Sequence, residues 1–289
     1  MLRSILVATD LSMRSERAIR RAAMLAGSTG AALTMLHVVD DDQPQSVVDA
    51  EARDAGRVLV DEAEALRAAR GIDPNVTVQT GHPAEAIARE ATGHDLVVMG
   101  AHRRRILADV FVGTTIERVI RTSARPVLMA SGPAAAPYRS VVAALDFSPS
   151  SDHAFATAAA FGMLDAPRLT LVHAYTPHAK GMMLYAGASD EAVQDHVLRT
   201  SVEATAAIRE RRDGLSLPSS TLVTADAREG DPARVVAACV GDVDADLLVI
   251  GTRGATGLSR FLLGSVAETL LRTLEIDILT APAPAGGGS

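Results

Sequence analysis

Near the carboxyl end of the chain, a stretch rich in glycine, hydroxyl and arginine residues lies between an apolar run and a helical segment. Two residues separate Gly251 from Gly254, nine more precede Gly264, and Ser265 follows it. Glycine lets backbone N–H groups come close to a ligand, and the first turn of a helix offers unpaired N–H donors. Arg253 adds a charged, forked donor of the kind that suits phosphate. The stretch therefore predicts a phosphate-binding loop.

A second stretch, in the first half of the chain, has the same spacing with one glycine replaced. Gly100 is followed by Arg103, nine residues lead to Gly113, and Thr114 comes next. The side chain of Arg103 either blocks the close approach of the backbone to phosphate or replaces the lost donors with its charge. The basic run HRRRILAD, from position 102, fits a phosphate patch or an ordinary solvated face. We therefore expect phosphate binding chiefly in the later copy, and weak or no binding in the earlier one.

These two stretches belong to two copies of one sequence plan. Asp10 and Asp146 follow the first apolar run of their copies and differ by 136 positions (146 − 10). Gly100 and Gly251 differ by 151 positions (251 − 100), so the later copy carries a net insertion of 15 residues (151 − 136) between its second and fourth strands. A repeat this long indicates duplicated domains, because solenoid repeats have periods of about 20 to 50 residues.

The boundary between the copies falls in the segment SGPAAAPYRS, which is rich in proline, glycine and alanine. We expect one domain over residues 1–136 and a second over 137–289, with 281–289 as a flexible tail. Each copy alternates short apolar runs with helical periodicity. In the first copy, strands are expected near 3–9, 32–39, 75–80, 95–100 and 126–130, and helices near 14–28, 46–70, 83–92 and 114–123.

Apolar strands separated by helices predict a parallel sheet that is covered on both faces. The expected fold is therefore α/β, with two tandem, doubly wound, Rossmann-like domains of parallel sheet. In this architecture ligands bind beyond the carboxyl ends of the strands, where the strand order reverses, and the stretch from Gly251 begins at such an end. The last strands of the copies, RPVLMA and IDILTA, are apolar and each lies at a sheet edge, so we expect them to pair within the chain.

The glycine spacing, the aspartate after the first strand and the segment LVHA together resemble the ATP-binding signature of the universal stress protein family, in its tandem two-domain form. The resemblance implies an adenine nucleotide alpha hydrolase-like fold that binds ATP, ADP or AMP, with or without Mg²⁺. It implies that Asp146 contacts the ribose or a phosphate-bound metal, and that the backbone of Ala174 contacts adenine. The phosphate-binding residues that it implies are Gly251, Arg253, Gly254, Gly264 and Ser265. The weaker matches in the first copy are Asp10, Val38, Gly100, Gly113 and Thr114.

Three functions stay open on these residues. The first is a stress-response regulator that signals through its nucleotide-bound state. The second is a slow ATP hydrolase or transferase on the same fold, although Asp146 is better used on ribose or metal than as a general base. The third is an interaction module without a ligand, in which the glycines only form a turn and a helix cap. Asp146 has a further alternative as the N-cap of the next helix, and His37 and His173 are interpreted as packing or turn residues.

Composition argues against several other classes. The net charge is −7, and three Tyr, five Phe and no Trp leave few stacking platforms for a nucleic-acid partner. The single Cys239 rules out a disulfide within the chain, and its apolar surroundings predict a buried thiol in a reducing compartment. The one lysine, Lys180, does not stand in a P-loop. Because the sequence shows no signal-peptide pattern and no apolar run of about 18 residues, we expect a cytoplasmic protein without a membrane partner. A homodimer of whole chains stays open.

Overall fold

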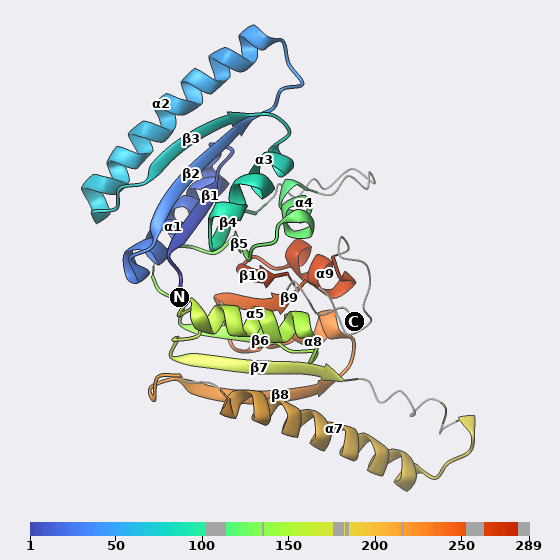
Figure 1. Cartoon of the computed structure of the whole chain (residues 1–289). Helices are drawn as coiled ribbons and strands as arrows, with labels where there is room; N and C mark the ends of the chain where they lie inside the picture. Colours follow the sequence, from blue (N-terminus) through green and yellow to red (C-terminus); the bar gives the residue numbers. More distant parts are fainter. Residues whose placement is uncertain are drawn as a thin grey trace.

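The computed structural model of the chain describes residues 1–101, 114–134, 136–175, 182, 185–214, 217–252 and 263–282. Over this part of the chain ten strands form a single sheet, with helices on both of its faces (Figure 1). The strand order is β3-β2-β1-β4-β5-β10-β9-β6-β7-β8, so each half of the chain contributes five neighbouring strands. The predicted α/β fold with two doubly wound halves is therefore confirmed.

The elements of the first half agree with the sequence prediction to within a few residues. Its strands are β1 (Ser4–Ala8), β2 (Ala32–Val39), β3 (Asn75–Thr80), β4 (Leu96–Gly100) and β5 (Val127–Ala130). Its helices are α1 (Met13–Thr29), α2 (Gln45–Arg70), α3 (Pro83–Glu90) and α4 (Thr115–Thr122), with a short 3₁₀ turn at Ala91–Gly93.

The second half repeats this order. Its strands are β6 (Ser140–Ala144), β7 (Arg168–Tyr175), β8 (Leu222–Glu229), β9 (Leu247–Gly251) and β10 (Asp277–Ala281). Its long helices are α5 (Pro149–Ala160), α7 (Asp190–Asp213), α8 (Pro232–Asp242) and α9 (Ser265–Thr273). Between β7 and β9 lie 71 residues (246 − 175), against 56 (95 − 39) between β2 and β4, so the predicted 15-residue insertion is confirmed in place. β10 extends to the buried Ala281, one residue into the expected tail.

The two halves join through their last strands. β10 pairs with β5 in antiparallel fashion, with Ile278 opposite Met129 and Thr280 opposite Val127. The other eight strand pairings are parallel. The predicted pairing of the last strands is confirmed, and each strand covers the apolar edge of the other.

Side chains from alternate positions of the strands build two cores, one on each face of the sheet. Ile5 and Val141 lie on the face covered by α1, α2, α5 and α7. Leu6 and Val142 lie on the face covered by α3, α4, α8 and α9. Each core runs across both halves, so the chain buries its apolar strands on both sides as the sequence predicts.

A buried polar cluster, the joint cluster of Arg21, Tyr138 and Asp277, fixes the segment that connects the halves. Asp277 is fully buried at the start of β10 and accepts hydrogen bonds from the backbone N–H groups of Ser131 (2.9 Å) and Gly132 (2.8 Å). The Tyr138 hydroxyl donates to it at 2.8 Å, and Arg21 Nε of α1 lies 2.7 Å from its Oδ2. The Arg21 guanidinium also lies 4.3 Å from the centre of the Tyr138 ring. One carboxylate thus connects both halves and the linker.

Two further expectations concern single features. Cys239 is buried in α8, as predicted; burial, and then the carboxylate of Asp226, raise the pKa of its thiol to about 11. Among the described residues, no helix combines the length and the apolar character that crossing a bilayer would require.

Candidate functional site

Four candidate residues of the second half lie along the carboxyl edge of its strands. Asp146 follows β6, Ala174 lies near the end of β7, Gly251 ends β9 and Ser265 begins α9. β6 pairs with β7 on one side and with β9 on the other. The chain leaves β6 for α5 on one face of the sheet and leaves β9 for α9 on the opposite face. This reversal is where doubly wound folds bind ligands.

The first half repeats the arrangement. Asp10 follows β1, Val38 lies in β2, Gly100 ends β4 and Thr114 precedes α4. Four residues of the predicted motifs lie outside the described residues: Arg103, Gly113, Arg253 and Gly254. Gly264 donates its backbone N–H to the carbonyl of Thr252 at 2.8 Å, so the described ends of the second glycine motif are joined.

Both aspartates lie in a tight turn that exposes the carboxylate. Oδ1 of Asp146 accepts from the backbone N–H of Ser148 at 3.0 Å, which is the pattern of an Asx turn. Asp10 makes the same bond with Ser12 at 3.0 Å. The N-cap of α5 is Ser148, whose side chain accepts from the N–H of Ser151 at 3.2 Å. The alternative that Asp146 is the N-cap is therefore wrong, because the hydroxyl two residues later takes that place.

The turn of the first half stabilises a charged carboxylate. Burial raises the pKa of Asp10, but hydrogen bonds from Ser12 and from the Ser15 hydroxyl (2.7 Å) outweigh it and leave that pKa below its ordinary value. The residue after each aspartate has a left-handed backbone: φ is 59° at Leu11 and 60° at Phe147. Such a conformation of a bulky residue costs about 1–3 kcal/mol and persists where its surroundings require it. The sequence gives no signal for this strain.

The first glycine of each motif has a packing reason as well. A Cβ atom added to Gly251 would lie 2.7 Å from the backbone nitrogen of Ser151, in the first turn of α5. A Cβ on Gly100 would lie 3.0 Å from the carbonyl oxygen of Arg14, in α1. Both glycines therefore let a helix approach the strand end closely, whether or not a ligand is bound.

The paired histidines connect neighbouring strands. His37 Nδ1 donates to the carbonyl of Thr9 at 2.9 Å, and His173 Nδ1 donates to the carbonyl of Leu145 at 2.6 Å. The ring of His173 also lies 4.4 Å from that of Phe147, centre to centre. These contacts support the interpretation of the histidines as packing and turn residues.

The first turns of α4 and α9 differ. In α4, the N-cap Thr114 and Glu117 form a capping box: the Thr114 N–H donates to Glu117 Oε2 at 3.1 Å, and the Glu117 N–H donates to Thr114 Oγ1 at 3.4 Å. In the described part of the chain, α9 has Gly264 at its N-cap and no capping bond from a side chain. Glu117 is not among the predicted site residues, although the spacing of Thr and Glu three residues apart marks a capping box.

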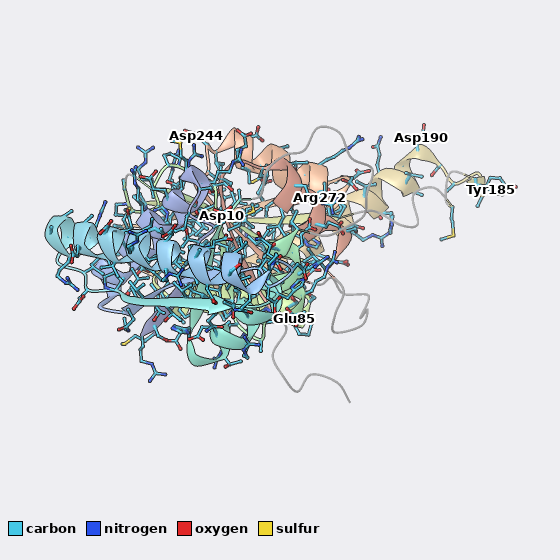
Figure 2. All side chains as sticks on the ribbon, turned by 90° about the horizontal axis from the view of Figure 1, so that it is seen from above. Asp10, Glu85, Tyr185, Asp190, Asp244 and Arg272 are labelled. Carbon is cyan, nitrogen blue, oxygen red and sulfur yellow. The ribbon has the colours of Figure 1, made fainter. Side chains whose placement is uncertain are left out.

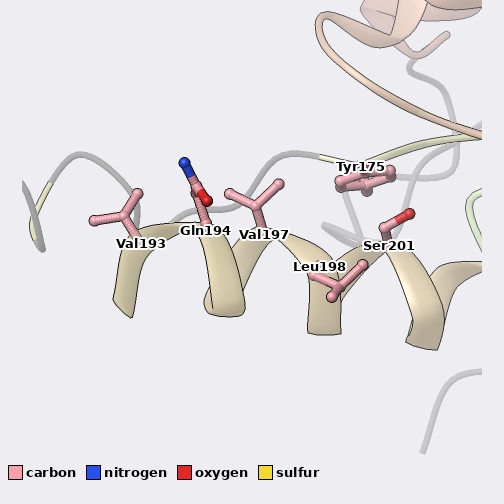
Figure 3. A pocket seen from close by; sticks show the side chains of 6 residues that line it. All are labelled: Tyr175, Val193, Gln194, Val197, Leu198 and Ser201. Atoms are coloured by element: carbon pink, nitrogen blue, oxygen red, sulfur yellow. The ribbon is translucent and has the colours of Figure 1, made fainter. Parts of the chain in front are cut away.

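A shallow pocket of about 370 Å³ lies between the end of β7 and α7 (Figure 3). Tyr175 forms one wall and the α7 side chains form the other: Val193, Gln194, Val197, Leu198 and Ser201. It adjoins Ala174 but includes none of the described phosphate-motif residues. The pocket thus adds an apolar surface beside the candidate site and does not define the site.

Comparisons with known proteins agree with the fold of the chain. The chain matches the model of the Universal stress protein family over residues 1–131 and again over 137–282. A universal stress protein of Mycobacterium tuberculosis is 27% identical over 293 residues, which cover 96% of this chain and 96% of that protein. The crystal structure of a universal stress protein from Archaeoglobus fulgidus superposes with a TM-score of 0.71 at 19% identity, covering 97% of this chain and 98% of the other. A putative universal stress protein from Pseudomonas aeruginosa gives a TM-score of 0.59 at 23% identity, with 97% and 93% covered.

Proposed function

The chain belongs to the universal stress protein family, and we propose that it binds ATP or a related adenine nucleotide and responds to stress through its bound state. The observation that carries this proposal is the placing of Asp146, Gly251 and Ser265 at one reversal of strand order, in the half that retains every glycine of the motif. We assign the site to a second domain over residues 137–289 and give the first domain, 1–136, a weaker role.

In this proposal the adenine lies at the end of β7, against the backbone of Ala174 and near the apolar pocket beside Tyr175. The ribose lies toward Asp146. The phosphates face the loop from Gly251 to Ser265, where Arg253 and the N-terminus of α9 supply positive charge and N–H donors. Mg²⁺ binds oxygen ligands, and the exposed Asp146 carboxylate and the Ser265 hydroxyl suit it; when bound, the ion would neutralise phosphate charge.

The unequal helix starts support a preference for the second half. A phosphate at the start of α4 would meet the Glu117 carboxylate, which already holds the N–H of Thr114. Like charges repel, so Asp10, Val38, Gly100, Gly113 and Thr114 would form at most a weak site. At the start of α9 the N-cap residue is Gly264, which brings no side chain into that space.

Calorimetric titration of the full chain with Mg-ATP tests the proposal, and we expect one tight site per chain. Gly254→Arg, which gives the second motif the arginine of the first, should weaken binding tenfold or more, about 1.4 kcal/mol. Gly241→Arg is the matched control, because Gly241 is exposed at the end of α8 and a Cβ there meets open space.

Equal affinity in the Gly254→Arg variant and the wild type would contradict the assignment of phosphates to this loop. Mass spectrometry of nucleotide released from the denatured protein identifies the natural ligand. Its absence, together with a silent titration, would favour an interaction module, and turnover above about one per minute would favour an enzyme.

A further inference from the structure

The start of the last helix in each half carries the same four-residue pattern but uses it differently. Thr114 to Glu117 reads TTIE and Ser265 to Glu268 reads SVAE, so each is a hydroxyl residue followed three positions later by glutamate. That spacing is typical of a capping box, in which the glutamate reaches back to the N–H of the hydroxyl residue. Only the first of the two forms it among the described residues.

In the second half the glutamate points along the helix. Glu268 Oε1 lies 2.8 Å from Arg272 Nη2, one turn further along the helix. Ser265 is the first residue of α9, and the N-cap position before it is taken by Gly264. The glutamate therefore pairs with an arginine of its own helix and does not cap the backbone. The N–H groups at the start of α9 are left to other partners.

The same arginine also holds the glutamate of the other half. Arg272 Nε donates to Glu117 Oε1 at 2.8 Å, and its Nη2 lies 3.4 Å from Glu117 Oε2. Glu117 is 1% exposed, whereas Arg272, labelled in Figure 2, is half exposed. The hydrogen bond that Arg272 donates to Glu117 is the main cause that raises the pKa of Arg272, so the guanidinium stays charged. The equivalent arginine of α4, Arg121, has a buried Nε without a partner among the described residues.

We propose that Arg272 is a positioning residue for the phosphate site: it keeps Glu268 away from the N-terminus of α9 and keeps Glu117 over that of α4. The inference rests on the proposed function, because it assigns phosphate to the start of α9. Without Arg272, Glu268 is free to close the SVAE capping box. Its carboxylate then takes the Ser265 N–H and repels a phosphate brought to the same helix end.

The test compares Mg-ATP affinity of the full chain in four forms: wild type, Arg272→Ala, Glu268→Ala and the double variant. We expect Arg272→Ala to weaken binding about fivefold. Glu268→Ala alone should stay within about twofold of wild type, because the Glu268 carboxylate is already held away from the helix end. The double variant should return to within about twofold of wild type. Arg121→Ala, which removes the same charge from α4, is the matched control and should not weaken binding.

One measurement, made in two backgrounds, separates this inference from its premise. Hydrogen exchange of the Ser265 amide, followed by NMR without nucleotide, should slow in Arg272→Ala and return to the wild-type rate when Glu268→Ala is added, because alanine has no acceptor for that N–H. Because Arg272→Ala removes one partner of the buried Glu117, the same comparison is made in a Glu117→Gln background, which carries no charge at that position.

If wild type binds ATP but Arg272→Ala binds it equally well, or the double variant fails to recover, the inference is overturned while the proposed function stands. If wild type binds no ATP, the proposed function fails. The exchange rate of the Ser265 amide then tests only whether Glu268 caps that N–H when Arg272 is absent. An unchanged rate in Arg272→Ala would show that it does not, and the inference would be overturned.

Discussion

The carboxylate of Asp277 offers a direct test of what holds the two halves together. We expect Asp277→Asn to destabilise the chain by about 3–5 kcal/mol, the usual cost of removing one member of a buried ion pair. The side chain is fully buried, lies 2.7 Å from Arg21 Nε and accepts three hydrogen bonds of 2.8 to 2.9 Å. Whole proteins of this kind are stable by about 5–15 kcal/mol, so the loss would be a large fraction of the total.

A graded series makes the magnitude more specific. Tyr138→Phe removes one hydrogen bond to a charged acceptor and keeps the ring beside Arg21, so about 1.5–3 kcal/mol should be lost. Burial, and then the Asp277 carboxylate, raise the pKa of Tyr138 well above its ordinary value, which keeps the hydroxyl protonated as a donor. Asp54→Asn is the matched control, since its partner Arg57 is 78% exposed and such surface pairs contribute about 0–1 kcal/mol.

Equilibrium unfolding in urea measures the total loss, and amide exchange in β5 and β10 shows where it falls. A loss of about 3 kcal/mol confined to the joint should speed exchange there more than a hundredfold. The reasoning is refuted if Asp277→Asn costs no more than Asp54→Asn. It is also refuted if β3 and β8, at the outer edges of the sheet, lose protection while β5 and β10 keep it.

Other substitutions test single features of the site and the core. Gly251→Ala should cost about 1–3 kcal/mol through its clash with α5, whereas Gly241→Ala should be neutral or stabilising, and thermal unfolding compares the two. Cys239, with a pKa near 11, should resist alkylation at pH 8 in the native protein and react at once in urea; rapid native labelling would contradict its burial. Since the pKa of Asp10 is lowered on folding, its contribution to stability is present above the unfolded value of about 3.9 and is lost as pH falls through the folded value. Ser15→Ala should raise that folded pKa in an NMR titration and shrink this contribution; an unchanged pKa would show that the Ser15 hydroxyl does not stabilise the carboxylate.

The elements of this fold follow largely from local pattern, because the inner strands are apolar runs buried on both faces, whereas the edge strands β3 and β8 are more polar and partly exposed. Leu247 to Ile250 is one such run, and Gly251 ends it where α5 comes close. The pairing of β5 with β10 also follows, since an apolar edge needs a partner. Local pattern does not show which of several similar residues takes a given role, such as the N-cap of a helix. In the segment DFSPSS, both Asp146 and Ser148 have side chains that can cap a helix, and the backbone geometry of the turn decides for Ser148.

The least predictable contacts are those in which the two halves differ although their sequences align. The positions equivalent to Asp277 and Arg21 are Pro126 (277 − 151) and Thr157 (21 + 136), which cannot form an ion pair. An identical pair of half-length chains would place every such residue at the joint twice. A tandem chain places it once, so a buried charge on one side needs no counterpart on the other. The joint cluster on one side and the Arg272 contacts with Glu117 and Glu268 are two uses of that freedom. The first secures the linker, and the second leaves the starts of α4 and α9 with different partners.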